Sequence, residues 1–335
     1  MLRKLIGFIV ILCLIGLAVY LLSHKQSAKP LPTKSSLAGV TKKDSFWTAP
    51  DSNQIPHSPE GDLIRYGRDL IANTSVYFGP HGSVARTANG MNCQNCHLDA
   101  GTKAFGNNYG AVFSTYPKYR ERRNAVETIN QRISDCFQRS LDGQAPDSNG
   151  HEMKAIFAYM RWLGSDVPRG KKPAGSGIEI LSFLDRPADS AKGMIVYIDK
   201  CQKCHGAKGQ GIFRPDSLHY FYPPLWGDHS YNTGAGLYRL SRFAGYVKNN
   251  MPLGASHQAS QVTLEEAWDV AAFVNSQPRK SKRFTKDWPD ISKKPIDHPF
   301  GPYIDSFSER QHKYGPFTPI KRAKDEWDKN KMAKK

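Results

Sequence analysis

An apolar segment near the start of the chain predicts a membrane-spanning helix. Residues 5–22 include no charged side chain, and a helix of this length extends roughly 27 Å, close to the hydrocarbon thickness of a bilayer. Arg3 and Lys4 precede it, so the positive-inside rule places the remainder of the chain outside the cytoplasm. A cleaved signal peptide is the alternative, with an apolar core of usually about 7–15 residues and a small-residue cleavage site. Because the residues SHK follow at 23–25, we interpret the segment as an uncleaved anchor.

Helical periodicity appears next on both sides of a CxxCH motif. Apolar residues between Leu63 and Ile71 recur at i, i+3, i+4 and i+7 spacings, which predicts a helix. The motif follows at residues 93–97, and residues 151–163 form a second amphipathic pattern that ends at Gly164. This order predicts a mainly helical first domain.

The second half repeats this order. A predicted helix at residues 189–200 leads directly into a second CxxCH motif at residues 201–205, and a long loop rich in Gly, Pro and Tyr follows. The last clear helix is predicted at residues 264–276, where Thr263 and Glu266 form a capping box. Its expected buried stripe is Leu264, Ala267, Trp268, Ala271 and Val274. The chain is therefore a weak internal repeat of helix, motif, loop and helix.

The net charge indicates anionic partners. The chain has 47 Lys+Arg against 30 Asp+Glu, a formal charge of +17, which favours nucleic acid, acidic lipid, acidic protein or a small anion. Residues 279–335 contribute 16 Lys+Arg and 8 Asp+Glu, together with six prolines and scattered aromatic residues. We expect this tail to be an extended strap packed on the domains, frayed from about Lys329. A nucleic-acid partner is not expected, because the anchor places the chain outside the cell interior.

The two CxxCH motifs are the strongest chemical signal. They contain Cys93, Cys96, His97, Cys201, Cys204 and His205. Two thiols three positions apart can reach both vinyl groups of one porphyrin, and the adjacent histidine then binds the iron as its proximal ligand. The alternatives are a zinc site or a redox CxxC pair, but zinc half-sites usually lie closer together and a redox pair does not explain a histidine in both motifs. We therefore expect two covalently bound haem c groups.

The ligand on the other side of each iron determines what each haem does. In the second half, Met251 follows His205 and precedes the last helix, as in class I cytochromes c, whose Met/His ligation raises the haem potential and suits electron transfer. A packing methionine is the alternative to this role, and Lys248 and His257 are the rival ligands.

The first half lacks an equivalent Met-Pro sequence. Its remaining candidates are His81, His151, the apolar-face methionines Met153 and Met160, and Cys136. Cys136 follows His97 at a suitable separation, and five arginines lie within 16 residues of it: Arg120, Arg122, Arg123, Arg132 and Arg139. A lone cysteine is usually a small buried hydrophobic residue. Cationic neighbours and an iron would instead lower its pKa, which favours a thiolate in an anion-binding pocket.

The motifs GMNCQNCHLDAGTKAFGNNYGAVFSTYPKYRERR and TINQRISDCFQRSLDG resemble the dihaem thiosulfate dehydrogenase/tetrathionate reductase family, TsdA. This half is more distantly similar to the SoxA subunit of sulfur-oxidising complexes, and the resemblance covers roughly residues 60–280. It implies that His97 and Cys136 are the ligands of the catalytic haem, and that His205 and Met251 are those of the electron-transfer haem.

The resemblance further implies that Arg122 and Arg132 bind the substrate. Thiosulfate and tetrathionate are dianions whose oxyanion ends suit arginine forks. Our hypothesis is that the sulfur of Cys136 leaves the iron and forms a transient S-thiosulfonate adduct. Some members of the family carry a competing lysine before the methionine ligand, and this sequence has Asn250 there.

The expected organisation is mainly helical, with two class I cytochrome c-like domains in tandem, and the anchor places them on the periplasmic side of the bacterial inner membrane. The expected redox partner is a small c-type cytochrome or a quinol-linked protein. A non-catalytic dihaem carrier, a peroxidase-type enzyme and a SoxA-like subunit are the alternatives. The predicted segments are an N-terminal transmembrane anchor (1–22), a linker (23–50), a catalytic cytochrome c domain (51–168), an interdomain linker (169–187), an electron-transfer cytochrome c domain (188–278) and a basic C-terminal extension (279–335).

Overall fold

The computed structural model describes residues 46–216 and 218–333. The predicted anchor at residues 5–22 and most of the linker after it lie outside the described residues. Within those described, none of the helices has the length and apolar character needed to cross a bilayer.

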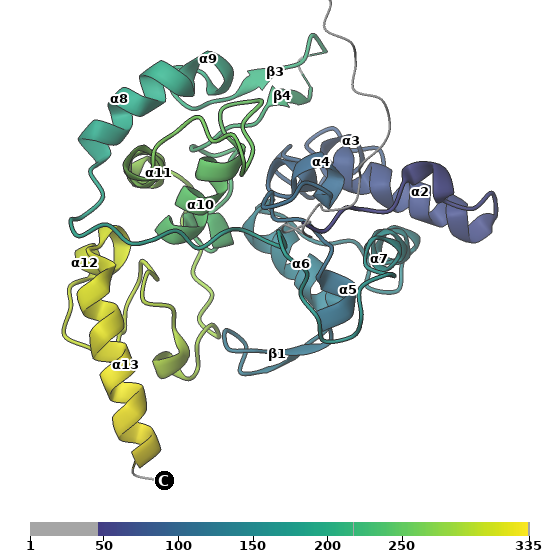
Figure 1. Ribbon diagram of the computed structural model, residues 1–335. Coiled ribbons are helices and arrows are strands. Elements are labelled where there is room, and N and C mark those ends of the chain that lie inside the picture. Colours follow the sequence, from purple (N-terminus) through teal and green to yellow (C-terminus); the bar gives the residue numbers. More distant parts are fainter. Residues whose placement is uncertain (1–45, 217, 334–335) are drawn as a thin grey trace, which may run out of the picture. The chain divides into compact units, whose positions relative to one another are not determined.

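The described residues are mainly helical, with two small antiparallel hairpins (Figure 1). The α-helices are α2 (Pro59–Ala72), α3 (Thr74–Phe78), α4 (Leu98–Gly101), α5 (Val112–Thr115), α6 (Ile129–Arg139), α7 (His151–Leu163), α8 (Ser190–Lys200), α9 (Gln202–His205), α10 (Leu240–Asn250), α11 (Leu264–Ser276), α12 (Glu309–Tyr314) and α13 (Phe317–Ala333). The 3₁₀ helices are η1 (Ser52–Gln54), η2 (Cys93–Asn95), η3 (Gly236–Tyr238) and η4 (Ile291–Lys293). The strands are β1 (Lys118–Arg120) paired with β2 (Ala125–Glu127), and β3 (Ile212–Phe213) paired with β4 (Tyr220–Tyr222).

Each half is built on one close crossing of two helices. In the first half α2 packs on α7, and in the second half α8 packs on α11 (Figure 1). Both crossings depend on a glycine: a Cβ on Gly67 would lie 1.9 Å from the carbonyl oxygen of Ala155, and a Cβ on Gly193 would lie 1.9 Å from that of Asp269. The repeat in the sequence is therefore also a repeat in helix packing, with a separate hydrophobic core in each half.

The predicted helices of the chain form with their predicted ends. Helices α7 and α11 have the expected bounds, and the capping box of Thr263 and Glu266 is present. Helix α8 begins after Asp189, whose carboxylate accepts hydrogen bonds from two backbone N–H groups. Of the predicted stripe on α11, four residues are fully buried and Leu264 is half-buried.

Helix α10 is an element that the loop prediction missed. Its apolar residues Leu240, Phe243, Ala244 and Val247 have helical spacing and are buried in the core of the second half. The helix ends at Asn250, directly before Met251. It therefore positions the candidate ligand of the second haem.

The basic tail packs on the domains as expected, but it is not only an extended strap. It contains α12 and α13, and α13 continues to Ala333, beyond the expected start of fraying at Lys329. Phe317 and Ile320 bury one side of α13 in the core of the second half. The exposed side is stabilised by an i,i+4 ion pair between Lys321 and Asp325. These charges conceal the helical pattern in the sequence.

Replacing Gly193 with alanine should destabilise the second half, because the added Cβ cannot fit against the carbonyl of Asp269. We expect the free energy of unfolding to fall by about 1–3 kcal/mol, measured by circular dichroism during denaturant unfolding of the haem-loaded protein. Gly236→Ala is the control, since a Cβ there meets no atom within 4 Å. Equal stability of the two variants would contradict the proposed need for a close crossing.

Candidate functional site

One cavity in the first half brings the predicted ligands together. It has a volume of about 180 Å³ and is lined by Cys93, Cys96, His97 and Cys136. Its walls are otherwise mostly apolar, with residues such as Ile71, Met91, Val112, Ile129, Ile133, Phe137, Leu141, Ile156 and Met160. An apolar pocket with two thiols and a histidine at one wall suits a covalently attached porphyrin.

His97 is held in the form that binds a metal. Its Nδ1 lies 2.6 Å from the carbonyl oxygen of Asn107, and its ring stacks on Tyr109 with centroids 4.5 Å apart. A backbone carbonyl on Nδ1 fixes the ring orientation and leaves Nε2 available. Burial lowers the pKa of His97 to about 4, so the ring is neutral at pH 7. The interdomain linker supports this arrangement, because the N–H of Asn107 donates to the carbonyl of Gly177 at 3.0 Å.

The two cysteines beside His97 do not have the properties of a redox pair. Cys93 and Cys96 are not joined by a disulfide, and burial raises the pKa of each thiol to about 12. A redox CxxC motif requires a lowered pKa instead. A structural zinc site requires four ligands, and the described residues contain no group of three or more His, Cys, Asp or Glu side chains placed to hold a metal ion.

The second CxxCH motif has the same histidine geometry. Nδ1 of His205 lies 2.8 Å from the carbonyl oxygen of Pro223, which again leaves Nε2 available. Met251 directly follows the last residue of α10, and it packs against the core of the second half together with Cys201 and Trp226. The residues of both motifs therefore fit a haem.

The two rivals of Met251 have other partners. Nζ of Lys248 donates to Oγ of Ser260 at 2.7 Å and to the carbonyl of Val262 at 2.9 Å. The ring of His257 stacks on Phe105 at a centroid distance of 4.1 Å. Both side chains are thus used in holding loops together.

Cys136 lies on α6, which places it in the cavity. Thr128 begins the helix with a capping box to Gln131, and Arg132 lies one turn before Cys136 on the same face. Both side chains line the cavity. The rival ligands His81 and His151 are exposed and do not line it.

Two methionines also border the cavity. Met160, which belongs to the hydrophobic core as expected, and Met91, two residues before Cys93, are among its lining residues. Met153 is fully buried and does not line the cavity. Cys136 differs from both lining methionines in lying one helical turn from a cationic side chain that also lines the cavity, that of Arg132.

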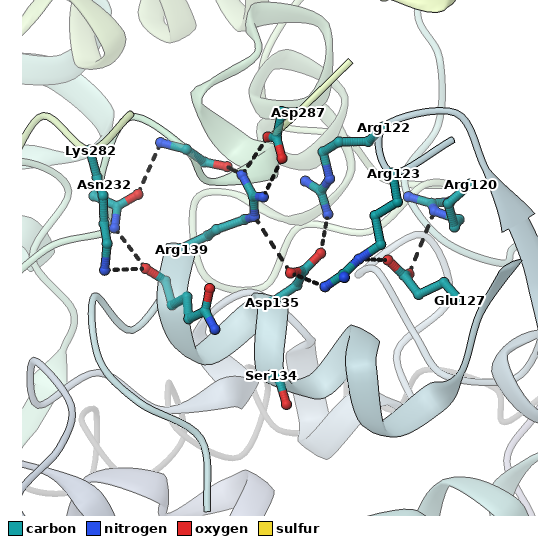
Figure 2. Close-up of polar contacts among 12 residues, drawn as sticks. Arg120, Arg122, Arg123, Glu127, Ser134, Asp135, Arg139, Asn232, Lys282 and Asp287 are labelled. Atoms are coloured by element: carbon teal, nitrogen blue, oxygen red, sulfur yellow. Dashed lines mark hydrogen bonds and ion pairs between the residues drawn. The ribbon is translucent and has the colours of Figure 1, made fainter. Parts of the chain in front are cut away.

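Asp135, the residue before Cys136, collects three of the five arginines (Figure 2). Its Oδ2 accepts from Arg122 at 2.9 Å, its Oδ1 accepts from Arg123 at 2.7 Å, and Nε of Arg139 lies 4.0 Å from Oδ1. Burial opposes the ionised form of Asp135, but these guanidinium groups outweigh it and hold the pKa of the carboxyl below its ordinary value. Asp135 is therefore an ionised centre of the cluster at neutral pH.

Two further carboxylates complete the cluster. Glu127 is fully buried and pairs with Nε of Arg123 at 3.0 Å and with Nε of Arg120 at 3.7 Å. Asp287, from the C-terminal tail, accepts two hydrogen bonds from Arg139 at 2.7 and 2.8 Å (Figure 2). Four of the five arginines thus have a carboxylate partner.

Arg132 is the exception. Among residues 46–216 and 218–333 its guanidinium group has no ion pair, and it faces the cavity with Cys136. The charge of a Cys136 thiolate is the main cause that raises the pKa of Arg132. Arg122 does not line the cavity. Burial and the charges of the neighbouring Arg132 and Arg139 lower the pKa of Arg122 to about 10.

Lys118 is a cavity residue that sequence reasoning missed. It lies on β1, two residues before Arg120, the first of the five arginines near Cys136, and its side chain lines the cavity with Arg132. Burial, together with the charges of Arg120 and Arg132, lowers its pKa to about 8. Because no aspartate or glutamate is among the lining residues, the cavity offers two cations without a competing acid. The signal in the sequence that could have identified Lys118 is its position two residues before Arg120.

Both halves of the chain match known protein families. The SoxA/TsdA cytochrome c domain family matches residues 83–168, and the Cytochrome c family matches residues 190–278. The thiosulfate dehydrogenase of Stutzerimonas stutzeri is 34% identical over 242 residues, which cover 72% of this chain and 76% of that protein. That of Allochromatium vinosum is 39% identical over 236 residues, covering 69% and 84%.

A solved structure is also similar. The thiosulfate dehydrogenase TsdBA from Marichromatium purpuratum superposes with a TM-score of 0.66 at 32% identity, covering 74% of this chain. The match covers 52% of that chain, so this chain corresponds to about half of it.

The fold and the site define a protein with two cytochrome c domains, which implies binding of c-type haem. More specifically, the chain belongs to the TsdA thiosulfate dehydrogenase family, a family of oxidoreductases that act on sulfur compounds.

Removing the charge of Asp135 should destabilise the protein at neutral pH. Asp135→Asn leaves buried guanidinium groups without their partner, so we expect the free energy of unfolding at pH 7 to fall by about 3 kcal/mol. Because the folded-state pKa of Asp135 is lowered, its stabilisation is complete above the unfolded pKa of about 3.9. It is lost as the pH falls through the folded-state value. Denaturant unfolding at several pH values should therefore show the two proteins converging in acid.

The control for this experiment is Asp166→Asn, which removes the same charge from an exposed position of the first half. It should match the wild type across the pH range. If Asp135→Asn and Asp166→Asn are equally stable at pH 7, Asp135 is not the centre of the arginine cluster.

Proposed function

We propose that this protein interconverts two thiosulfate ions and one tetrathionate ion, with transfer of two electrons, and that the Cys136 thiolate is the nucleophile. The observation that carries the proposal is the cavity that Cys136 shares with His97 and the unpaired Arg132. In this proposal Cys93, Cys96 and His97 hold the catalytic haem c, with Cys136 as its second axial ligand.

The charges of the cavity support a small dianion as substrate. Arg132 has no acidic partner in the described part of the chain, and Lys118 adds a second cation at the same cavity. A guanidinium group can donate two parallel hydrogen bonds to a sulfonate. Arg132 therefore binds one sulfonate end and orients the sulfane sulfur toward Cys136, while Lys118 lies available for the second sulfonate of tetrathionate.

Arg122 has an indirect position in the same site. Its Nη2 is held by Asp135 at 2.9 Å, and its side chain is 12% exposed. We place it behind Arg132. Its charge there adds to the positive potential of the cavity and attracts a bound anion, although Arg122 does not line the cavity.

The reaction balances in two steps at Cys136. The thiolate bonds to the sulfane sulfur of one thiosulfate, giving Cys–S–S–SO₃⁻ and two electrons. A second thiosulfate attacks the sulfane sulfur of this adduct, so the S–S bond between Sγ of Cys136 and that sulfur breaks, and tetrathionate and the thiolate leave. When bound, the two haems can each accept one of the electrons. In the reverse direction the thiolate attacks tetrathionate and the same bonds change in the opposite order.

The second half provides the exit for electrons. His205 and Met251 are the proposed axial ligands of the second haem c, attached through Cys201 and Cys204, and the rivals Lys248 and His257 already have other contacts. We propose that a small c-type cytochrome or a quinol-linked protein exchanges electrons there. We also propose a periplasmic location, with residues 5–22 as the membrane anchor.

The non-catalytic carrier is the main competing function. It requires a buried Cys136 without contact to the haem site, whereas Cys136 is half-buried and lines the same cavity as His97. A SoxA-like subunit needs a second haem protein, and this chain carries its own second cytochrome c domain.

Replacing Cys136 with glycine or methionine should nearly abolish turnover while both haems stay attached. The nucleophile is lost, whereas the thioether bonds depend only on the CxxCH motifs. The measurement is thiosulfate oxidation and tetrathionate reduction by the purified protein, with haem content determined from the absorbance of the reduced haem. Cys136→Ser tests whether a smaller polar group can replace the thiolate, and it should also be inactive. Normal activity of any of these variants would refute the proposal.

A further inference from the structure

We propose that the C-terminal tail positions Arg122 beside the substrate cavity of the first half, and that Asp287 is the positioning residue. This inference rests on the proposed function. The segment concerned, residues 284–288, is called the tail clamp below. It lies beyond residue 278, where the match to the Cytochrome c family ends. No residue of the tail lines the cavity itself.

The tail clamp holds Arg139 by several contacts at once. Both oxygens of Asp287 accept from the guanidinium group of Arg139, at 2.7 and 2.8 Å. The same guanidinium lies over the ring of Phe284, 3.6 Å from its centroid. The Arg139 side chain is only 7% exposed. A guanidinium group that forms two hydrogen bonds to a carboxylate and also stacks on an aromatic ring is held in a single orientation.

The tail clamp also holds the backbone of Arg122. The N–H of Trp288 donates to the carbonyl oxygen of Arg122 at 2.8 Å. Trp288 adopts a φ of 59°, in the left-handed region that a bulky residue avoids, so this contact is made at a cost in backbone energy. Two adjacent tail residues thus contact two different arginines of the cluster.

Asp287 prevents a competition for Asp135. Nε of Arg139 is already 4.0 Å from Oδ1 of Asp135, one turn away on the same helix. Nε has no hydrogen-bond partner within the described chain. If Asp287 lost its charge, the nearest carboxylate for the buried Arg139 would be Asp135. Arg139 would then approach Oδ1, which Arg123 already holds at 2.7 Å. Three guanidinium groups would compete for one carboxylate, which would weaken the bond between Oδ2 and Arg122, 2.9 Å long in the present arrangement.

Asp287 therefore acts on substrate binding through a chain of three charges. It fixes Arg139, this leaves Asp135 to Arg122, and Arg122 stays beside the cavity that contains Arg132 and Cys136. The carboxylates and guanidinium groups follow one another in this order in Figure 2. A residue from the far end of the chain thereby determines the charge distribution around the candidate nucleophile.

The test is Asp287→Asn in the full-length protein with both haems attached. We expect the KM for thiosulfate to rise at least about tenfold, because Arg122 is held less firmly beside the cavity. The matched control is Asp290→Asn, three residues further along the tail, where the side chain caps η4 through the N–H of Ser292. This control should keep the wild-type KM. Asp287→Glu keeps the charge and should bring the KM back toward that of the wild type.

A second substitution separates positioning from simple stabilisation. In Arg139→Gln/Asp287→Asn no guanidinium competes for Asp135, so the KM should fall back from that of Asp287→Asn toward the wild-type value. A purely structural contact would not produce this recovery. If Asp287→Asn does not accumulate with two haems, the double variant and Asp287→Glu are compared with the wild type. Both should then accumulate with a KM near that of the wild type, and a double variant that fails to accumulate or has a tenfold higher KM would overturn the inference.

The inference is wrong if Asp287→Asn has the KM of the Asp290→Asn control, or if the double variant has a higher KM than Asp287→Asn. A wild-type protein without thiosulfate turnover would instead contradict the proposed function alone. The clamp then remains testable by thermal unfolding of the same variants. The double variant should lose less stability than the sum of the two single substitutions, and strict additivity would refute the contact.

Discussion

Buried guanidinium groups require carboxylate partners, and this requirement explains most polar contacts around α6. Moving an arginine out of water is costly unless its charge is paired and its N–H groups are bonded. Glu127, Asp135 and Asp287 meet this requirement for four arginines. Arg132 is left unpaired beside Cys136 in the described structure, so an anion that enters the cavity supplies the missing partner. The ion pairs that stabilise the fold thus leave Arg132 as the arginine that we propose to bind substrate.

The two halves use one architecture for different tasks. Each crosses two helices at a glycine, attaches a CxxCH motif and holds the motif histidine by a backbone carbonyl. In the second half, α10 ends at Asn250, directly before Met251. In the first half the candidate ligand Cys136 lies within α6, between Asp135 and Arg139, and Arg139 pairs with Asp287 of the tail. The charged groups beside Cys136 account for the proposed division into catalysis and electron transfer.

Local signals made much of the fold predictable. Helices α8 and α11 combine an apolar stripe with a capping side chain, and the apolar stripe of α7 lies between Gly150 and Gly164, so their bounds follow from the sequence. Helix α10 has an apolar pattern of the same kind, but it lies between Gly- and Pro-rich segments and ends in Asn249 and Asn250, which favour loops. Helix α13 is rich in charges, and it is stabilised by burial of Phe317 and by i,i+4 pairs.

In the site, too, contacts between residues near in the sequence were predictable, and contacts between distant residues were not. Cys136 and Arg132 are one helical turn apart, and the CxxCH motifs are contiguous, so spacing and the family resemblance could name them as candidates. The pairing of Arg139 with Asp287 joins residues 148 positions apart, and no sequence period reports such a contact. Sequence reasoning therefore counted five arginines around Cys136 but could not tell that carboxylates occupy four of them.

The central claim is that Cys136 binds the first haem as a thiolate within reach of Arg132. Electron paramagnetic resonance of the oxidised, haem-loaded protein tests it most directly, because a thiolate ligand gives a low-spin iron signal distinct from that of a Met/His haem. The account predicts both signals in the wild type, with the thiolate signal lost and the Met/His signal kept in Cys136→Gly. A wild type without a thiolate signal, or a variant that retains it, would contradict the account.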